Sequence, residues 1–189
     1  MANKVLIVEG SDKSKSLSGW REGFEFLLRN AGLAKLPRII PSFGRDKAIG
    51  EFKKDYWEND KIYLLIDLDG PSETKSQLLT EKGLSKSSGH VFFSIQEIEA
   101  WFLSQPSILD DFFGKGLNGE RPSNRLNKKD PSLFDDAKFE LKRITKGTRR
   151  GTYMDSIHGP LLLKKLDAST LTNYFPDEFG KLLKALGHR

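Results

Sequence analysis

The chain has 189 residues, no cysteine and a formal net charge of +5. This length suits one domain, or one domain with a small appendage. The absence of cysteine excludes disulfides, thiolate zinc sites, iron–sulfur clusters and cysteine nucleophiles. With 13 Phe, 4 Tyr and 3 Trp the apolar residues are bulky, so we expect a packed core rather than disorder.

The sequence contains no recognisable targeting segment. The apolar run at residues 5–8 is too short for a signal peptide and is followed directly by Glu9. No stretch approaches the ~18 apolar residues that a membrane helix needs. We therefore expect a cytoplasmic protein with no membrane contact.

The first part of the chain alternates between strand and helix patterns. Continuous apolar runs predict strands at 4–8, 37–41, 61–67 and 90–95. Helical spacing occupies the intervals between them and resumes from Ile95. Alternation of this kind predicts the α/β class, with a mostly parallel four-stranded sheet flanked by helices.

The remainder of the chain predicts a helical C-terminal part. Helix patterns cover 133–144, 157–166 and 175–186, whereas 114–131 is a polar, Gly-rich and basic loop. We therefore divide the chain into an α/β core at 1–105 and a helical extension at 106–189.

Positive charge is concentrated in the extension. Residues 114–150 hold eleven Lys or Arg against five Asp or Glu, a local charge of +6, so the rest of the chain sums to −1. Such a stretch suits a polyanion, although a solvated face has the same composition. The best candidates for contact with a nucleic-acid backbone are Lys128, Lys129, Arg149 and Arg150.

Carboxylates follow the predicted strands. Glu9 ends the first strand, and Asp67 and Asp69 end the third. Ligands of parallel sheets bind beyond the carboxyl ends of the strands. Period-two geometry points Asp67 and Asp69 to one side, and hard oxygen ligands favour Mg²⁺ or Mn²⁺. A divalent-metal site for phosphate chemistry is the sharper interpretation, and ordinary turn residues are the alternative.

Two more acids follow the fourth strand. Glu97 and Glu99 are two apart on a predicted helix, so one metal site is not expected to use both. Glu99 lies toward the apolar side of that helix, where a buried carboxylate needs a partner. We favour Glu99 as the site residue and keep Glu97 as an accessory candidate.

Other polar residues are weaker candidates. Arg45 and Lys47 lie at a predicted helix start, a place suited to a phosphate clamp, and Lys75 lies just past the turn at residue 70. His158 stands beside Gly159 and Pro160 and is a possible accessory residue. For all four, an ordinary solvated or structural role is the alternative.

The segments Val5-Leu6-Ile7-Val8-Glu9-Gly10 and Ile66-Asp67-Leu68-Asp69-Gly70 resemble the two signature motifs of the Toprim domain. The stretch from Gln96 to Leu103, including Glu99-Ala100-Trp101, looks like a family of small bacterial Toprim-like proteins of unknown function. Related members stand beside ABC-type ATPases in anti-phage islands. The segment from Tyr153 to Leu161 also looks familial, but Asp155 stands where the family often carries a basic residue.

This resemblance implies a Toprim-like fold and a nuclease that hydrolyses DNA or RNA. Glu9 would be the general acid/base or a metal ligand, Asp67 and Asp69 would hold Mg²⁺ or Mn²⁺, and Glu99 would complete the acidic cluster. It also implies an effector of anti-phage defence with an ATPase partner, and it leaves a homodimer open.

Two alternatives remain. A non-catalytic Toprim-fold binding subunit would keep the shape, but it is expected to lose acids that this chain retains. A phosphoacceptor receiver domain would show adjacent acids after the first strand and a Lys after a fifth, and neither is present in the sequence pattern.

Overall fold

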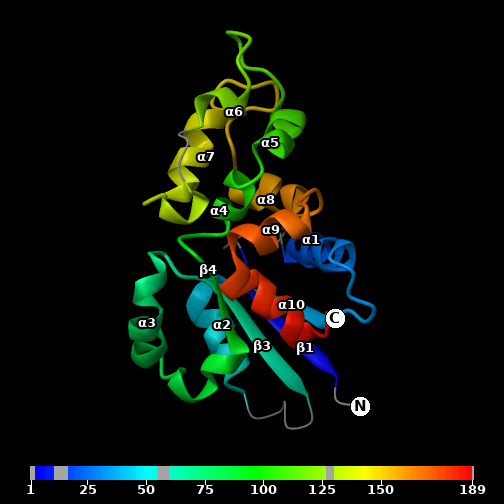
Figure 1. Cartoon of the computed structure of the whole chain (residues 1–189), viewed down its shortest axis with the longest axis vertical. Helices are drawn as coiled ribbons and strands as arrows, with labels where there is room; N and C mark the ends of the chain where they lie inside the picture. Colours follow the sequence, from blue (N-terminus) through cyan, green and yellow to red (C-terminus); the bar gives the residue numbers. More distant parts are fainter. Residues whose placement is uncertain (1–2, 11–16, 55–59, 127–129, 189) are drawn as a thin grey trace.

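The computed structural model describes residues 3–10, 17–54, 60–126 and 130–188. At its centre is a sheet of four parallel strands in the order β2-β1-β3-β4 (Figure 1). The strands are β1 (Lys4–Gly10), β2 (Arg38–Phe43), β3 (Lys61–Asp67) and β4 (Val91–Ser94). The middle of β1 and β3 is buried because both strands are central in the sheet and covered on both faces. The predicted α/β class and four-stranded parallel sheet are therefore confirmed.

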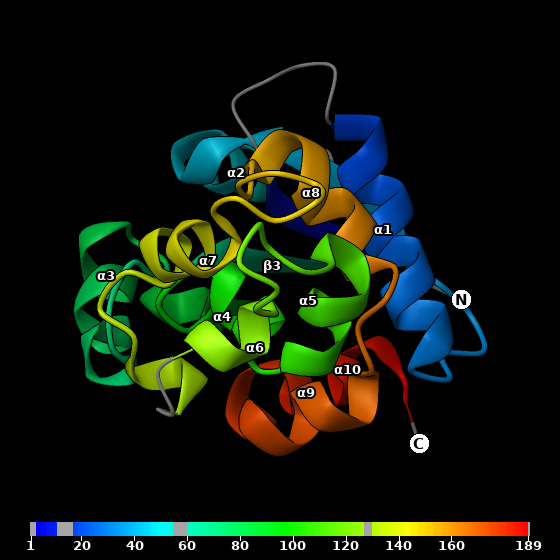
Figure 2. The same cartoon turned by 90° about the horizontal axis from the view of Figure 1, so that it is seen from above.

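Helices lie on both faces of this sheet. The connections between strands are α1 (Leu17–Asn30), α2 (Gly44–Phe52) and α3 (Lys75–Glu81), with short 3₁₀ turns at Ser72–Thr74 and Ser85–His90. Helix α2 packs against β1, β2 and β3 from one side. The last helix, α10 (Lys181–Leu186), covers the opposite face, as the two views in Figures 1 and 2 agree.

A group of helices stands beyond the carboxyl ends of the strands. Seen from above in Figure 2, these helices lie over β3. They are α4 (Glu99–Leu103), α5 (Pro106–Phe113), α6 (Pro122–Arg125), α7 (Ala137–Thr145) and α8 (Asp155–Leu163), with a 3₁₀ turn at Pro131–Leu133. The chain then returns to the sheet through α9 (Ala168–Tyr174) and a π-helical turn at Pro176–Gly180.

The helical part shares its core with the sheet. Buried apolar residues form one cluster that runs from Val5 in β1 to Leu186 in α10 and crosses the predicted boundary at residue 105. Helix α8 packs closely on α1 because glycine occupies the contact. A Cβ at Gly159 would lie 2.8 Å from the ring of Trp20, and one at Gly23 would lie 2.8 Å from the carbonyl oxygen of Pro160.

Some predicted helix boundaries are wrong. The helix expected from Ile95 begins at Glu99, because Gln96 has a φ of +62° and residues 95–98 form a turn. The helix expected from Leu133 begins at Ala137, where the side chain of Asp136 accepts the backbone N–H of Phe139 at 2.6 Å. Short helices α5 and α9 were not predicted, and α6 interrupts the predicted loop at 114–131. None of the described helices is long and apolar enough to cross a membrane.

Candidate active site

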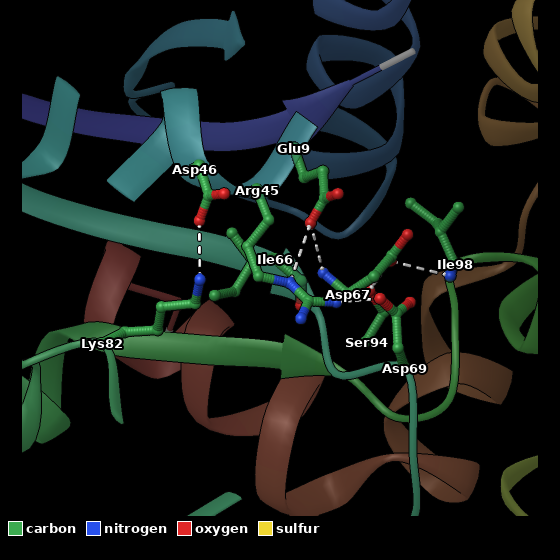
Figure 3. Close-up of polar contacts among 9 residues, drawn as sticks. All are labelled: Glu9, Arg45, Asp46, Ile66, Asp67, Asp69, Lys82, Ser94 and Ile98. Carbon is green, nitrogen blue, oxygen red and sulfur yellow. Dashed lines mark hydrogen bonds and ion pairs between the residues drawn. The ribbon is translucent and has the colours of Figure 1, made fainter. Parts of the chain in front are cut away.

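Glu9 lies near the end of β1, beside the end of β3. Its Oε2 accepts a hydrogen bond from the backbone N–H of Asp67 at 3.0 Å. The Nε of Arg45, in the first turn of α2, lies 3.9 Å from the same oxygen (Figure 3). Parallel pairing therefore brings the acid of one strand to the terminus of its neighbour, as the sequence predicted.

Asp67 is the last residue of β3. Its Oδ1 accepts hydrogen bonds from the hydroxyl of Ser94, at the end of β4, and from the backbone N–H of Ile98 at 2.9 Å. Within the described ranges no hydrogen bond reaches its Oδ2. One carboxylate oxygen is thus held by the protein, and the other is available.

Asp69 is positioned by a turn rather than by strand alternation, because β3 ends at Asp67. Both Asp69 and Gln96 adopt left-handed backbone conformations, with φ of +52° and +62°. Their segments are tied together, since Asp69 N–H donates to Gln96 O at 2.6 Å and Gln96 N–H donates to Gly70 O at 3.0 Å. The exposed carboxylate of Asp69 forms an ion pair with the guanidinium of Arg45 (Figure 3). Such conformations persist where the surrounding structure determines them, as at functional sites.

Glu99 is the first residue of α4, and its side chain is only 2% exposed. Its Oε1 accepts a hydrogen bond from the hydroxyl of Tyr153 at 3.0 Å. The Nζ of Lys138, on α7, lies 3.8 Å from that oxygen and 3.7 Å from Oδ2 of Asp155, on α8. The partners of this buried acid therefore come from the C-terminal helices.

These side chains open on a common cleft of about 130 Å³ at the carboxyl edge of the sheet. The carboxylates in its wall come from β1, β3, α4 and α8, and the amine comes from α7. The lining residues are Glu9, Gly10, Trp20, Gly44, Asp67, Ile98, Glu99, Lys138 and Asp155. The helical extension is therefore part of this site.

Burial dominates the electrostatics of the three innermost acids. It raises the pKa of Glu9 to about 7, although the hydrogen bond from Asp67 and the charge of Arg45 act in the opposite direction. Burial, followed by the charge of Glu9, raises the pKa of Asp67 to about 8. Burial, followed by the charge of Asp67, raises the pKa of Glu99 to about 8. Complete ionisation of this group near neutral pH requires an added cation.

Lys138 supplies one internal cation. Burial lowers the pKa of its ammonium, but the nearby charges of Glu99, Asp155, Glu97 and Asp67 outweigh burial and the net change is upward. Arg45 supplies the other cation, between Glu9 and Asp69. Each basic residue therefore lies beside different acids: Arg45 beside Glu9 and Asp69, and Lys138 beside Glu99 and Asp155.

The oxygen ligands of the cleft suit a hard divalent cation, but in the described residues they are not arranged around one position. Carboxylate oxygens, without sulfur or imidazole, are the set that Mg²⁺ and Mn²⁺ prefer. In the part of the chain that the structure describes, no group of three acids or histidines is arranged to hold one ion. An ion bound by Glu9 and Asp69 would take the place that Arg45 occupies.

Two predicted residues have structural roles nearby. Glu97 accepts the backbone N–H of Lys138 at 2.8 Å, so it caps the first turn of α7, while Glu99 faces the cleft. Lys75 forms an ion pair with the buried Glu178, whose other oxygen accepts the backbone N–H of Phe93 at 2.8 Å. Glu178 thereby accepts a backbone N–H on the free edge of β4. Lys75 neutralises the charge of Glu178 and does not line the cleft.

The remaining predicted residues are not gathered at the cleft. Lys47 is exposed on α2. His158 is buried against Phe112, Phe113 and Tyr153, and its Nδ1 accepts the backbone N–H of Met154 at 3.0 Å. Arg149 and Arg150 are exposed between α7 and α8. Lys128 and Lys129 lie outside the described residues.

Two charged residues of the cleft wall, and Tyr153, which donates to Glu99, were not selected from the sequence as site residues. Lys138 and Asp155 come from different helices, and only tertiary packing brings them together. Tyr153 lies in the segment that resembles the Toprim-like family, which was the one available signal. Lys138 carries no such signal, because a lysine in an amphipathic helix is ordinarily solvated.

Comparison with known proteins gives one match. A family model described as a domain of unknown function, DUF4276, matches residues 10–187. No curated protein and no solved structure matches the chain. The match begins directly after Glu9 and covers all the other residues that line the cleft.

Proposed function

The chain belongs to the DUF4276 family, a domain of unknown function, and we propose that it is a Mg²⁺-dependent nuclease with a Toprim-like catalytic cleft. The reaction would be phosphodiester hydrolysis of DNA or RNA. Support for the Toprim-like assignment comes from the motifs around Glu9 and Asp67 and from the position of both at the carboxyl edge of a parallel sheet.

One observation carries the proposal: Glu9, Asp67 and Glu99 converge on a single cleft and are held there with raised pKa values. A protein gains nothing from one buried and two partly buried acids that repel one another. Such an arrangement is typical of sites that bind a cation or move a proton. Binding of Mg²⁺ or Mn²⁺ would stabilise all three in their ionised form.

The metal, held by Glu9, Asp67 and Asp69, would neutralise charge on a phosphodiester and lower the pKa of a bound water. The chain's own groups then have separate tasks. Glu9, with a pKa of about 7, is suited to accept or return a proton near neutral pH. Arg45 and Lys138 can orient phosphate oxygens, and Glu99 with Tyr153 holds Lys138 in place.

The biological setting that we propose rests on the family resemblance alone. In that setting the protein is an effector of anti-phage defence in the cytoplasm, controlled by an ABC-type ATPase partner, with a homodimer as a candidate assembly. Co-purification of the chain with an ATPase encoded beside it, and a mass measurement of the complex in solution, would test that setting.

A specific observation also favours the alternative of a non-catalytic binding subunit. Arg45 and Lys138 already pair with Asp69 and Glu99, and within the described ranges no three acids are arranged as metal ligands. In this alternative the two basic residues permanently replace the metal, and the cleft has only an architectural role.

A cleavage assay separates the two. Purified protein is incubated with plasmid, single-stranded DNA or total tRNA, in Mg²⁺, Mn²⁺ or EDTA. We expect metal-dependent cleavage that Asp67→Ala/Asp69→Ala abolishes and that Asp46→Ala retains, since Asp46 is an exposed acid paired with Lys82 (Figure 3). If the wild-type chain neither cleaves nor releases heat on titration with Mn²⁺, the nuclease proposal is wrong.

A further inference from the structure

Basic residues of the helical extension fall into two groups. Arg125 is paired with Glu120, Arg143 with Glu140, and Lys138 with Glu99 and Asp155. By contrast, no ion pair within the described ranges involves Lys115, Arg121 or Arg149. The latter three are exposed.

Three of the basic residues without an ion pair in the described ranges line one hollow. Lys115, Arg121 and Arg149, here called the basic hollow, surround a space of about 400 Å³ near the C-terminal end of α5. Its wall also includes Asp110, Asp111 and Gly114. Both oxygens of Asp110 are engaged by Ser123, at 2.9 Å from its backbone N–H and 2.6 Å from its hydroxyl. Three basic side chains face two carboxylates in this wall, so the hollow has a net charge of +1.

The backbone holds these cations in place. The N–H of Arg149 donates to Lys115 O at 3.2 Å, and the N–H of Arg150 donates to Phe113 O at 3.3 Å. Gly114 has a φ of +73°, and a Cβ there would lie 3.4 Å from Nε of Arg149. A glycine thus lets the Arg149 side chain lie against the main chain, and little conformational entropy remains to be lost on binding.

The neighbouring arginine is fixed in a different way. The guanidinium of Arg150 stacks on Phe112 with 4.4 Å between its Cζ and the ring centroid. A stacked guanidinium still presents its N–H groups at the edge. The loop between α7 and α8 therefore offers two successive, ordered arginines to solvent.

This loop leads directly to the cleft. After Arg150 the chain runs through Tyr153, which binds Glu99, to Asp155 in the wall of the cleft. From Arg149 in the hollow to Asp155, six residues of extended chain span at most about 22 Å. At about 3.4 Å per nucleotide of a stacked strand, this distance corresponds to about six nucleotides.

We propose that the basic hollow formed by Lys115, Arg121 and Arg149 binds backbone phosphates of a nucleic-acid strand whose scissile bond lies in the acidic cleft. This assignment rests on the proposed function for the position of the scissile bond, but binding at the hollow requires no metal. The hollow anchors the strand within about six nucleotides of the cleft. An acidic cleft repels polyanions, so a cationic anchor outside it supplies the affinity that the cleft lacks.

The test measures binding in EDTA, where no cleavage occurs. Fluorescence anisotropy follows a labelled 20-nucleotide single strand and its duplex, at several salt concentrations, with the full chain and with Arg121→Ala/Arg149→Ala. The control is Lys35→Ala/Lys86→Ala, which removes the same charge from two exposed lysines at the amino edge of the sheet. Lys115→Ala/Arg121→Ala is a second variant, and melting curves confirm that each protein is folded.

Loss of two phosphate contacts should weaken binding by about tenfold or more. It should also reduce the slope of log K against log salt by roughly 1.4 for the single strand and 1.8 for the duplex. The lysine control should change neither value appreciably. Equal weakening in Arg121→Ala/Arg149→Ala and in the lysine control would show that only the net charge matters. Unchanged binding in Arg121→Ala/Arg149→Ala would show that the hollow is not an anchor. Equally effective competition by polyglutamate would also overturn a nucleic-acid site.

The two proposals fail separately. If the arginine variant loses affinity while no metal-dependent cleavage is found, phosphate binding at the hollow is supported and the nuclease proposal is wrong. If Asp67→Ala/Asp69→Ala abolishes cleavage while the arginine variant binds as the wild type does, the nuclease proposal is supported and phosphate binding at the hollow is wrong.

Discussion

The backbone N–H of Asp67 donates to the carboxylate of Glu9 at 3.0 Å, so the last residue of β3 positions an acid of β1. An amide carries no net charge, and this bond therefore orients Glu9 without neutralising it. The charge of Glu9 in turn raises the pKa of the Asp67 carboxyl, after burial as the larger cause. Strand pairing thus assembles a group of acids whose charge must be balanced from elsewhere.

The first prediction concerns stability against pH for Asp67→Asn. Burial raises the pKa of Asp67 from its ordinary 3.8 to about 8, so the folded state binds more protons than the unfolded state between these values. Stability attributable to this group therefore falls as pH rises from about 4 to 8. Asn stays neutral while its side-chain oxygen still accepts from Ser94 and Ile98. We expect the variant at pH 8 to be more stable by more than about 1.4 kcal/mol, or roughly 3–6 °C in Tm.

Calorimetry in EDTA at pH 5, 6, 7 and 8 measures this difference. Asp46→Asn serves as the control, because its bond to Lys82 lowers the pKa of Asp46 and gives the opposite sign. A variant that is less stable than the wild type at pH 8 would contradict the raised pKa.

The second prediction concerns the metal. Mg²⁺ or Mn²⁺ at 100 times its Kd should stabilise the wild type by about 2.7 kcal/mol, a Tm increase of roughly 5–10 °C. Asp67→Ala/Asp69→Ala should show no such increase, and Asp46→Ala should retain it. Thermal melts with and without metal measure the shift. The same shift in all three proteins would place the ion somewhere other than the cleft.

The third prediction concerns Tyr153→Phe. The Tyr153 hydroxyl donates to Glu99 at 3.0 Å and acts to lower the pKa of that carboxyl. Removal of this hydroxyl should lower the free energy of unfolding by about 0.5–1.5 kcal/mol and raise the pKa of Glu99 further. We expect a lower Tm and an alkaline shift of the pH–rate profile. Tyr174→Phe, at an exposed position, is the control. An unchanged profile together with an unchanged Tm would mean that this bond has no energetic role.

The fourth prediction concerns the contact between α1 and α8. In Gly159→Ala the new Cβ would lie 2.8 Å from the ring of Trp20 and 3.3 Å from the hydroxyl of Tyr153. Displacement of α8 should lower the free energy of unfolding by about 1–3 kcal/mol and move Asp155 away from Lys138. Gly50→Ala is the matched control, since a Cβ there meets nothing within 4 Å and alanine favours the helix. Equal Tm values for the two variants would contradict the close approach.

The sheet and the acids at its carboxyl edge can be predicted from the sequence alone. Continuous apolar runs are sufficient to identify buried parallel strands, and β3 was predicted with its observed bounds of Lys61–Asp67. Because parallel strands end at one edge, the positions of Glu9 and Asp67 in the sequence already implied that they are neighbours. Glu99, preferred over Glu97 as the site residue, lines the cleft, but the helical argument for it was wrong, since Glu97 precedes the helix and caps α7.

Which residues balance the charge of those acids follows from tertiary packing and could not be predicted from the sequence. Lys138 and Asp155 meet Glu99 because α7 and α8 pack over the strand ends, and that packing depends on contacts between residues far apart in the chain, such as Gly159 with Trp20. Lys75, which the sequence placed near the site, is instead paired with Glu178 from the end of the chain. Local sequence patterns indicate which residues are buried and which end a strand. The partner of a charged side chain depends on long-range packing, and the helical or strand periodicity of the sequence does not predict it.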